Sequence, residues 1–170
     1  MIARNQHLIQ FFLFLVLMGL ALPFTPLLRS PEGQKALSYF VPAVYGLFIL
    51  YTFYRWYLLR SRKKNLRTWL KPLIFSGVLA GLVWHEDLFV EQLHYIQYIT
   101  VYILCLRVFP HASNRHMGMA LMISIGIGAA DEGIQLFLRE RVFDFRDISL
   151  NALGCIFGYV WSRIFRSQNS

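Results

Sequence analysis

Charged residues are scarce in this chain. Asp, Glu, Lys and Arg together make up 15% of its 170 residues, whereas soluble domains carry about a quarter. Residues of the hydrophobic set make up 56%, and they are gathered into long runs. This combination argues against a soluble domain and predicts a polytopic membrane protein.

Cysteines are also few. Cys105 and Cys155 both lie inside apolar runs, with no CxxC spacing and no histidine at a metal-binding distance along the chain. We therefore expect both thiols to pack in the interior, and we expect no disulfide framework. A histidine pair of the HxxxH type is absent as well, and we predict no metal and no cofactor.

Among the charged residues, the basic ones predominate. There are 17 Lys and Arg against 9 Asp and Glu, which gives a formal charge of +8. Most of the basic residues stand at the ends of apolar runs, and the densest group is at residues 60–67. That pattern is typical of residues that orient a protein next to anionic lipid. We therefore predict membrane lipids as partners and no nucleic acid; a partner-binding role for the basic run is the less favoured alternative.

Six apolar runs are candidates for membrane spans. They are Leu8–Leu28, Tyr39–Leu59, Trp69–Trp84, Gln92–Phe109, a stretch within Met117–Leu138, and Ile148–Phe165. The third is the shortest, and Lys71 near its start is able to snorkel to the membrane surface. Between the first two runs, Arg29–Ser38 contains Pro31 and Gly33, and we expect a short loop there.

The distribution of basic residues predicts the orientation. With six spans, both termini lie on one side, and that side holds most of the Lys and Arg residues. The positive-inside rule then places both termini in the cytoplasm. The predicted fold class is an all-α polytopic membrane helix bundle with six transmembrane helices and cytoplasmic N and C termini.

Polar side chains recur at the outer ends of three predicted spans. The fourth span opens on two of them, the fifth closes on three, and the sixth opens on two. They are His94 and Tyr98; Asp131, Glu132 and Gln135; and Asp147 and Asn151. Pairs four residues apart share a helical face. We expect these side chains to converge on one shallow cavity at the outer interface.

Two motifs resemble the VanZ-like family. The segment Glu91–Tyr98 is similar to a family pattern E-K-I/L-H-F-x-E-Y, with Gln92 in place of the lysine and Gln97 in place of the second acid. A second family pattern begins with D-E-x-x-Q. A proline and an arginine follow, and then Asp, Asn and Gly positions. It corresponds to Asp131, Glu132, Gln135, Arg139, Arg141, Asp147, Asn151, Gly154 and Gly158, with Arg139 in place of the proline.

The resemblance covers roughly Trp69 to Arg166. It implies a division into an N-terminal transmembrane helix pair with its basic loop, residues 1–68, and a VanZ-like four-helix unit, residues 69–170. It also implies an integral membrane protein, in a bacterial inner membrane, of a family linked through its founding member to teicoplanin resistance.

We interpret the polar residues first as a binding site for a cell-envelope lipid or glycolipid headgroup. Arg139, Arg141 and Arg146 suit a phosphate or carboxylate. The acids and amides suit hydroxyls, amides or a bridging cation. The full predicted binding set is Glu91, Tyr98, Gln135, Arg139, Arg141, Arg146, Asp147 and Asn151, beside His94, Asp131 and Glu132.

Two alternatives remain open at this point. In the first, the protein is a hydrolase or transferase for a lipid-linked substrate, with His94 as general acid or base and Asp131 or Glu132 sharing its protons. The absence of an activated Ser or Cys at this depth counts against an acyl-enzyme, and a metal site at these three residues is weakly supported. In the second, the polar cluster is a structural ion-pair network that includes Arg141 and only joins helix ends.

Overall fold

The computed structural model describes residues 2–21, 25–59, 66–111, 113–135 and 145–166. These residues form seven α-helices and no strand, which confirms the all-helical class. The helices are α1 (Ile2–Ala21), α2 (Thr25–Arg29), α3 (Pro31–Leu59), α4 (Leu66–Trp84), α5 (Phe89–Val108), α6 (Asn114–Gln135) and α7 (Phe145–Arg166).

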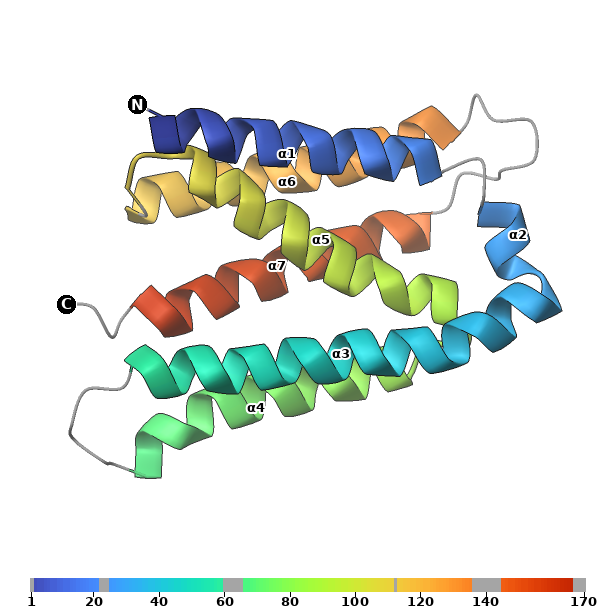
Figure 1. Ribbon diagram of the computed structural model, residues 1–170, viewed down its shortest axis with the longest axis horizontal. Helices are drawn as coiled ribbons and strands as arrows, with labels where there is room; N and C mark the ends of the chain where they lie inside the picture. Colours follow the sequence, from blue (N-terminus) through green and yellow to red (C-terminus); the bar gives the residue numbers. More distant parts are fainter. Residues whose placement is uncertain (1, 22–24, 60–65, 112, 136–144, 167–170) are drawn as a thin grey trace.

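The six long helices run side by side, and successive ones point in opposite directions (Figure 1). The start of α1 and the end of α7 therefore lie at the same end of the bundle. The opposite end holds α2, the α4–α5 connection, the C-terminus of α6 and the N-terminus of α7. We call this the distal end.

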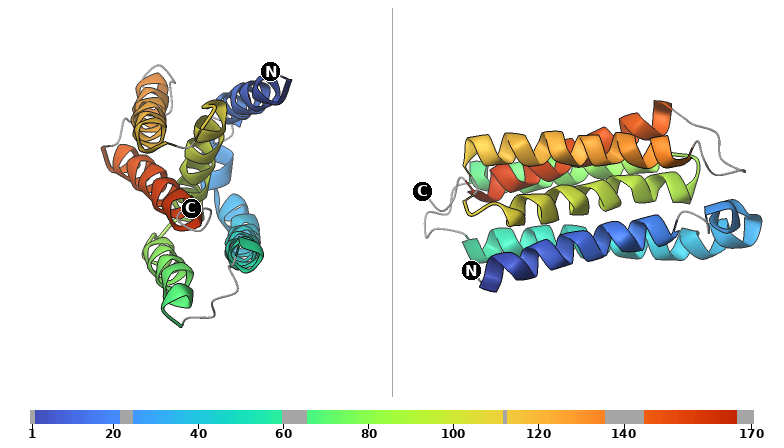
Figure 2. Two further views of the ribbon diagram at one scale, coloured as in Figure 1. Left: turned by 90° about the vertical axis from the view of Figure 1, so that its left-hand side faces the viewer. Right: turned by 90° about the horizontal axis from the view of Figure 1, so that it is seen from above.

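Helix α5 occupies the centre of the bundle (Figure 2). It contacts all six other helices, and its most extensive interface is with α7. The two backbones approach closely because glycines of α7 face α5. A Cβ atom on Gly154 would lie 2.8 Å from the Cβ of Tyr98, and one on Gly158 would lie 2.8 Å from the Cδ1 of Tyr102. These two glycines therefore permit the close packing of α7 against α5.

Three other glycines do not bring helices of the described chain together. A Cβ atom on Gly77, Gly81 or Gly126 would meet no heavy atom within 4 Å. In α4 the reason is that Gly77 and Gly81 are exposed, whereas Phe75 and Leu79 face the interior.

The start of α3 also differs from the expectation of a loop at Arg29–Ser38. Helix α3 begins at Pro31, and its first turn is capped by Ser30, whose Oγ accepts a hydrogen bond from the amide of Gly33 at 3.1 Å. Proline is well suited to the first helical position, because its missing N–H has no partner there in any case. Glu32 in the same turn complements the helix dipole.

Two helical stretches are long and apolar enough to cross a membrane, Pro31–Leu58 and Asn114–Gln135, and Asn5–Leu20 and Leu70–Trp84 are shorter apolar stretches. The count of six spans and the side of the termini are therefore not established by length and composition. Large apolar side chains are exposed on α1, α3 and α4, among them Phe12, Leu47 and Ile74. Exposed apolar faces of this extent are typical of contact with lipid or protein.

Candidate functional site

Polar side chains of three helices meet near the distal end, inside the bundle. We call them the inner cluster: His94 and Tyr98 of α5, Asp131, Glu132 and Gln135 of α6, and Asn151 of α7. Hydrogen bonds join all three helices in pairs: α5 to α7, α5 to α6, and α7 to α6. The three helix ends therefore meet as the sequence predicted, while the roles assigned to these residues stay predictions.

Asn151 orients the imidazole of His94. The amide nitrogen of Asn151 donates to the carbonyl oxygen of Gly128 at 3.3 Å, so its Oδ1 faces His94, where it lies 2.7 Å from Nδ1. Because Oδ1 only accepts, Nδ1 must carry the proton. A neutral His94 then keeps its lone pair on Nε2, which is the arrangement that a hydrogen-bond acceptor or a general base needs.

Tyr98 connects α5 to α6. Its hydroxyl donates to Oδ2 of Asp131 at 3.0 Å, and its ring is parallel to the imidazole of His94 with the centroids 6.4 Å apart. Tyr98 is fully buried, whereas His94 and Asp131 are half-buried. The tyrosine therefore holds the carboxylate in place and does not itself face the surroundings.

Glu132 and Gln135 are buried as deeply as Tyr98 and Asn151. The amide nitrogen of Gln135 donates to Oε1 of Glu132 at 2.8 Å, and both side chains are almost completely inaccessible. A buried carboxylate requires hydrogen bonds to offset its lost hydration. These two residues therefore act on the site through its polarity and shape, since neither is exposed to an incoming ligand.

Gly128 belongs to the site, although it was not among the residues predicted from the sequence. Besides accepting the hydrogen bond from Asn151, it lets α6 approach α5 and α7. A Cβ atom there would lie 2.9 Å from the Cβ of Asn151 and 3.1 Å from Cε1 of Tyr98. The available signal was the concentration of Gly and Ala just before Asp131.

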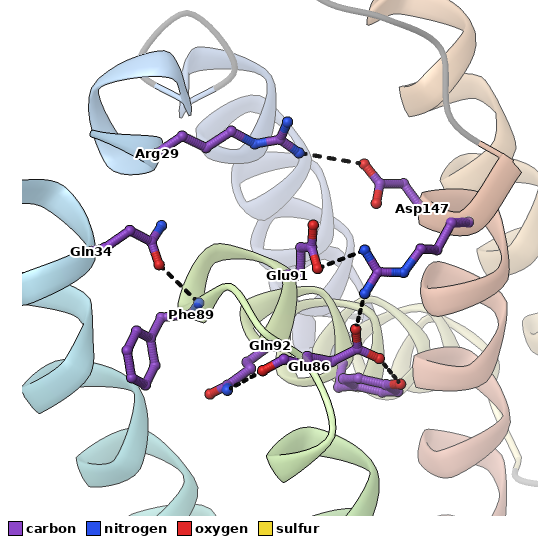
Figure 3. Close-up of polar contacts among 9 residues, drawn as sticks. Arg29, Gln34, Glu86, Phe89, Glu91, Gln92 and Asp147 are labelled. Carbon is purple, nitrogen blue, oxygen red and sulfur yellow. Dashed lines mark hydrogen bonds and ion pairs between the residues drawn. The ribbon is translucent and has the colours of Figure 1, made fainter. Parts of the chain in front are cut away.

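A second polar group, the distal ion pairs, lies closer to the helix ends (Figure 3). The guanidinium of Arg146 pairs with Glu86, and its Nη1 lies 2.8 Å from Oε2 of Glu91. Tyr95 donates a hydrogen bond to the other oxygen of Glu86 at 3.1 Å. Desolvation lowers the pKa of Arg146, but the carboxylates of Glu91 and Glu86 outweigh it and raise that pKa above its ordinary value. The arginine therefore links the start of α7 to the α4–α5 connection and to α5.

Asp147 makes an ion pair with a residue outside the inner cluster (Figure 3). Its Oδ2 lies 3.9 Å from Nη2 of Arg29 in α2, and the carboxylate is buried. Three predicted ligand-binding residues, Glu91, Arg146 and Asp147, thus make ion pairs within the protein. Their partners Glu86 and Arg29 were not predicted as site residues. The available signal was the acidic stretch at residues 86–91, which contains no Lys or Arg. Arg139 and Arg141 lie outside the described residues.

The geometry limits the chemistry of the inner cluster. Within the described ranges, no three His, Cys, Asp or Glu side chains are grouped as metal ligands, so His94, Asp131 and Glu132 do not form the weakly supported metal site. The partners found for His94 and Asp131 are Asn151 and Tyr98. The two partly exposed members, His94 and Asp131, are the ones that a ligand is able to reach.

Comparison with known proteins gives one match. A family model described as VanZ/LLP1 matches residues 11–166, nearly the whole chain. The match therefore includes most of α1, together with α3 and α4, as well as the three helices α5, α6 and α7 that carry the motifs. No curated protein and no solved structure matches significantly.

Proposed function

Because the chain belongs to the VanZ/LLP1 family, we propose that it binds the headgroup of a cell-envelope lipid or glycolipid at the distal end of the bundle. Family membership is consistent with a membrane protein linked to glycopeptide resistance. In this proposal the chain crosses a bacterial inner membrane six times, with both termini in the cytoplasm and the distal end at the outer face. Headgroup binding there alters sensitivity to lipoglycopeptides.

One observation carries the proposal: His94 and Asp131 are partly exposed, and each is held by a buried partner on another helix. Side chains that reach a ligand are most effective when supporting residues fix their rotamers. Ionisable residues that face the interior of a membrane bundle are costly, and they are commonly retained for function. The arrangement therefore fits a preorganised binding site.

The chemistry of the two exposed groups indicates what kind of headgroup fits. A carboxylate at Asp131 accepts hydrogen bonds from hydroxyl and amide N–H groups. Nε2 of a neutral His94 accepts another. Arg146, which the sequence analysis assigned to phosphate binding, is already paired with Glu86 and Glu91. The sugar or peptide part of a lipid-linked headgroup therefore suits the inner cluster better than its phosphate.

The test is the lipid content of the purified protein with Asp131→Asn. The asparagine keeps an oxygen that accepts the hydrogen bond of Tyr98, so the fold is retained while the negative charge is lost. We expect mass spectrometry to find an envelope lipid enriched with the wild type, and this enrichment to disappear in the variant. Glu32→Gln removes an exposed acid in the first turn of α3 and serves as the control that keeps the lipid.

Each other result has a definite meaning. Equal enrichment in the wild type and in Asp131→Asn rejects the binding site. If Asp131→Asn lowers the melting temperature by more than about 4 °C, roughly 1 kcal/mol for a chain of this size, the cluster is structural and the scaffold alternative is favoured.

The enzyme alternative has one supporting observation, the tautomer that Asn151 imposes on His94. In that tautomer Nε2 keeps its lone pair, which is suited to proton transfer. Release of a headgroup by the purified protein, abolished by His94→Ala, would establish a hydrolase or transferase. Lipid enrichment with no turnover would establish binding alone.

A further inference from the structure

A cavity of about 560 Å³ lies between α3 and α4, on the opposite side of α5 from α6. Its volume is in the range of small-molecule pockets. Most of its wall is apolar. The lining includes Tyr45, Gly46 and Ala80 along the helices, and Glu86, Asp87 and Gln92 at the distal end.

The cavity exists because small residues face it from both helices. A Cβ atom on Gly46 would meet no heavy atom within 4 Å, and Ala80 is exposed on the facing helix. Trp84, which is 89% exposed, also lines the cavity near its distal end. Tryptophan at such a position is typical of the boundary between lipid tails and headgroups.

The polar end of the cavity is acidic. Glu86 and Asp87 contribute carboxylates and Gln92 an amide, and no Lys, Arg or His is among the lining residues. Glu86 already pairs with Arg146. Asp87 is exposed, and it makes no hydrogen bond or ion pair to the described part of the chain. The free charge at this end is therefore negative, which attracts cations and repels anions.

We propose that this cavity holds one acyl chain of a membrane lipid whose headgroup carries an ammonium group, and that the ammonium group faces Asp87. The apolar wall suits a hydrocarbon chain that runs along α3 and α4. The acidic end selects an amine-bearing headgroup over an anionic one. The site is separate from the inner cluster, and it does not rest on the function proposed above.

The experiment uses the full chain, purified in detergent and titrated with single-chain lipids under native mass spectrometry. The probes are lysophosphatidylethanolamine, which carries an ammonium group, and lysophosphatidylglycerol, which does not. We expect the wild type to bind the ethanolamine lipid about two- to fivefold more tightly, the ratio that one exposed charge pair gives. Asp87→Asn should remove most of this preference, because it weakens binding of the ethanolamine lipid and relieves the repulsion of the anionic glycerol lipid.

A filled cavity provides the second arm. Gly46→Leu adds a side chain at a position that lines the cavity and where a Cβ atom meets no heavy atom within 4 Å, so we expect it to fold and to lose binding of the ethanolamine lipid. Gly77→Leu adds the same side chain to α4, where a Cβ atom also meets nothing within 4 Å, but outside the lining, and should bind as the wild type does. Asp131→Asn should also bind this probe normally, which separates the two sites.

Three results would overturn the proposal. One is equal affinity of the wild type for the two headgroups. Another is unchanged binding in Gly46→Leu, which would place the lipid elsewhere. The last is a preference for ethanolamine that survives Asp87→Asn.

Discussion

At the scale of single residues, the shape of the inner cluster depends on positions that carry no side chain. Gly154 brings α7 against α5 so closely that a Cβ atom would lie 2.9 Å from the backbone oxygen of Tyr95. A backbone atom does not move aside as a flexible side chain does. The hydrogen bond between His94 and Asn151 spans the same interface, so its geometry relies on this close approach.

We therefore expect Gly154→Ala to destabilise the protein by about 1–3 kcal/mol, the usual cost of overpacking. The matched change Gly126→Ala, where a Cβ atom meets nothing within 4 Å, should be neutral or should stabilise α6 by up to about 1 kcal/mol, because alanine favours the helix. Thermal unfolding in detergent measures both. Equal effects of the two changes would contradict the close packing of α5 and α7.

At the scale of the helices, α3 is the element whose extent the sequence analysis misjudged. Its 29 residues begin at Pro31, within the stretch expected to be a loop. The start of this helix is also joined to α5, because Oε1 of Gln34 accepts a hydrogen bond from the amide of Phe89 at 3.0 Å (Figure 3). The first turn of α3 therefore positions the distal end of α5, where the inner cluster begins.

Removal of the cap should weaken this turn. Ser30→Ala deletes the oxygen that accepts the amide of Gly33, and we expect a loss of about 1 kcal/mol, as for other N-caps. Hydrogen exchange at Gly33 and Gln34 should become faster than in the wild type. Ser38→Ala, which removes a hydroxyl bonded only to the carbonyl of Lys35, is the control and should leave exchange in this turn unchanged.

At the scale of the whole molecule, the antiparallel order of the long helices divides the bundle into two ends. The inner cluster, the distal ion pairs and the acidic end of the α3–α4 cavity all lie at the distal end. The connection between α5 and α6 lies at the other end, together with the start of α1 and the end of α7 (Figure 1). The candidate site and the end that holds both described termini are thus separated along the bundle axis.

This separation predicts the pattern of labelling in cells. Asp87 and Arg115 are exposed residues at opposite ends of the bundle. With the proposed orientation, a membrane-impermeant maleimide added to intact cells should react with Asp87→Cys and not with Arg115→Cys, and inside-out vesicles should show the reverse. Native Cys105 and Cys155 are buried and give little background. Labelling of both variants from the same side would reject the proposed topology.

Much of the fold was predictable from local patterns. The apolar runs predicted the positions of the six long helices. A helix that packs against other helices or faces lipid needs apolar residues along its whole length. The boundaries were less predictable. Pro31 and Gly33 are common in loops and also at capped helix starts, and only the hydrogen bond of Ser30 distinguishes the two.

The site divides in a similar way. The sequence alone determined the family, the helical class and the placement of acids, amides and a histidine at three helix ends, because these follow from residue type and order along the chain. Only the tertiary structure decided which of them bond to one another. It paired His94 with Asn151 and Tyr98 with Asp131, and it assigned Arg146 and Asp147 to ion pairs. The physical reason is that the rotation and spacing of the helices depend on contacts between segments far apart in the chain, such as the approach of Gly154 to α5. Local sequence patterns do not reveal such contacts.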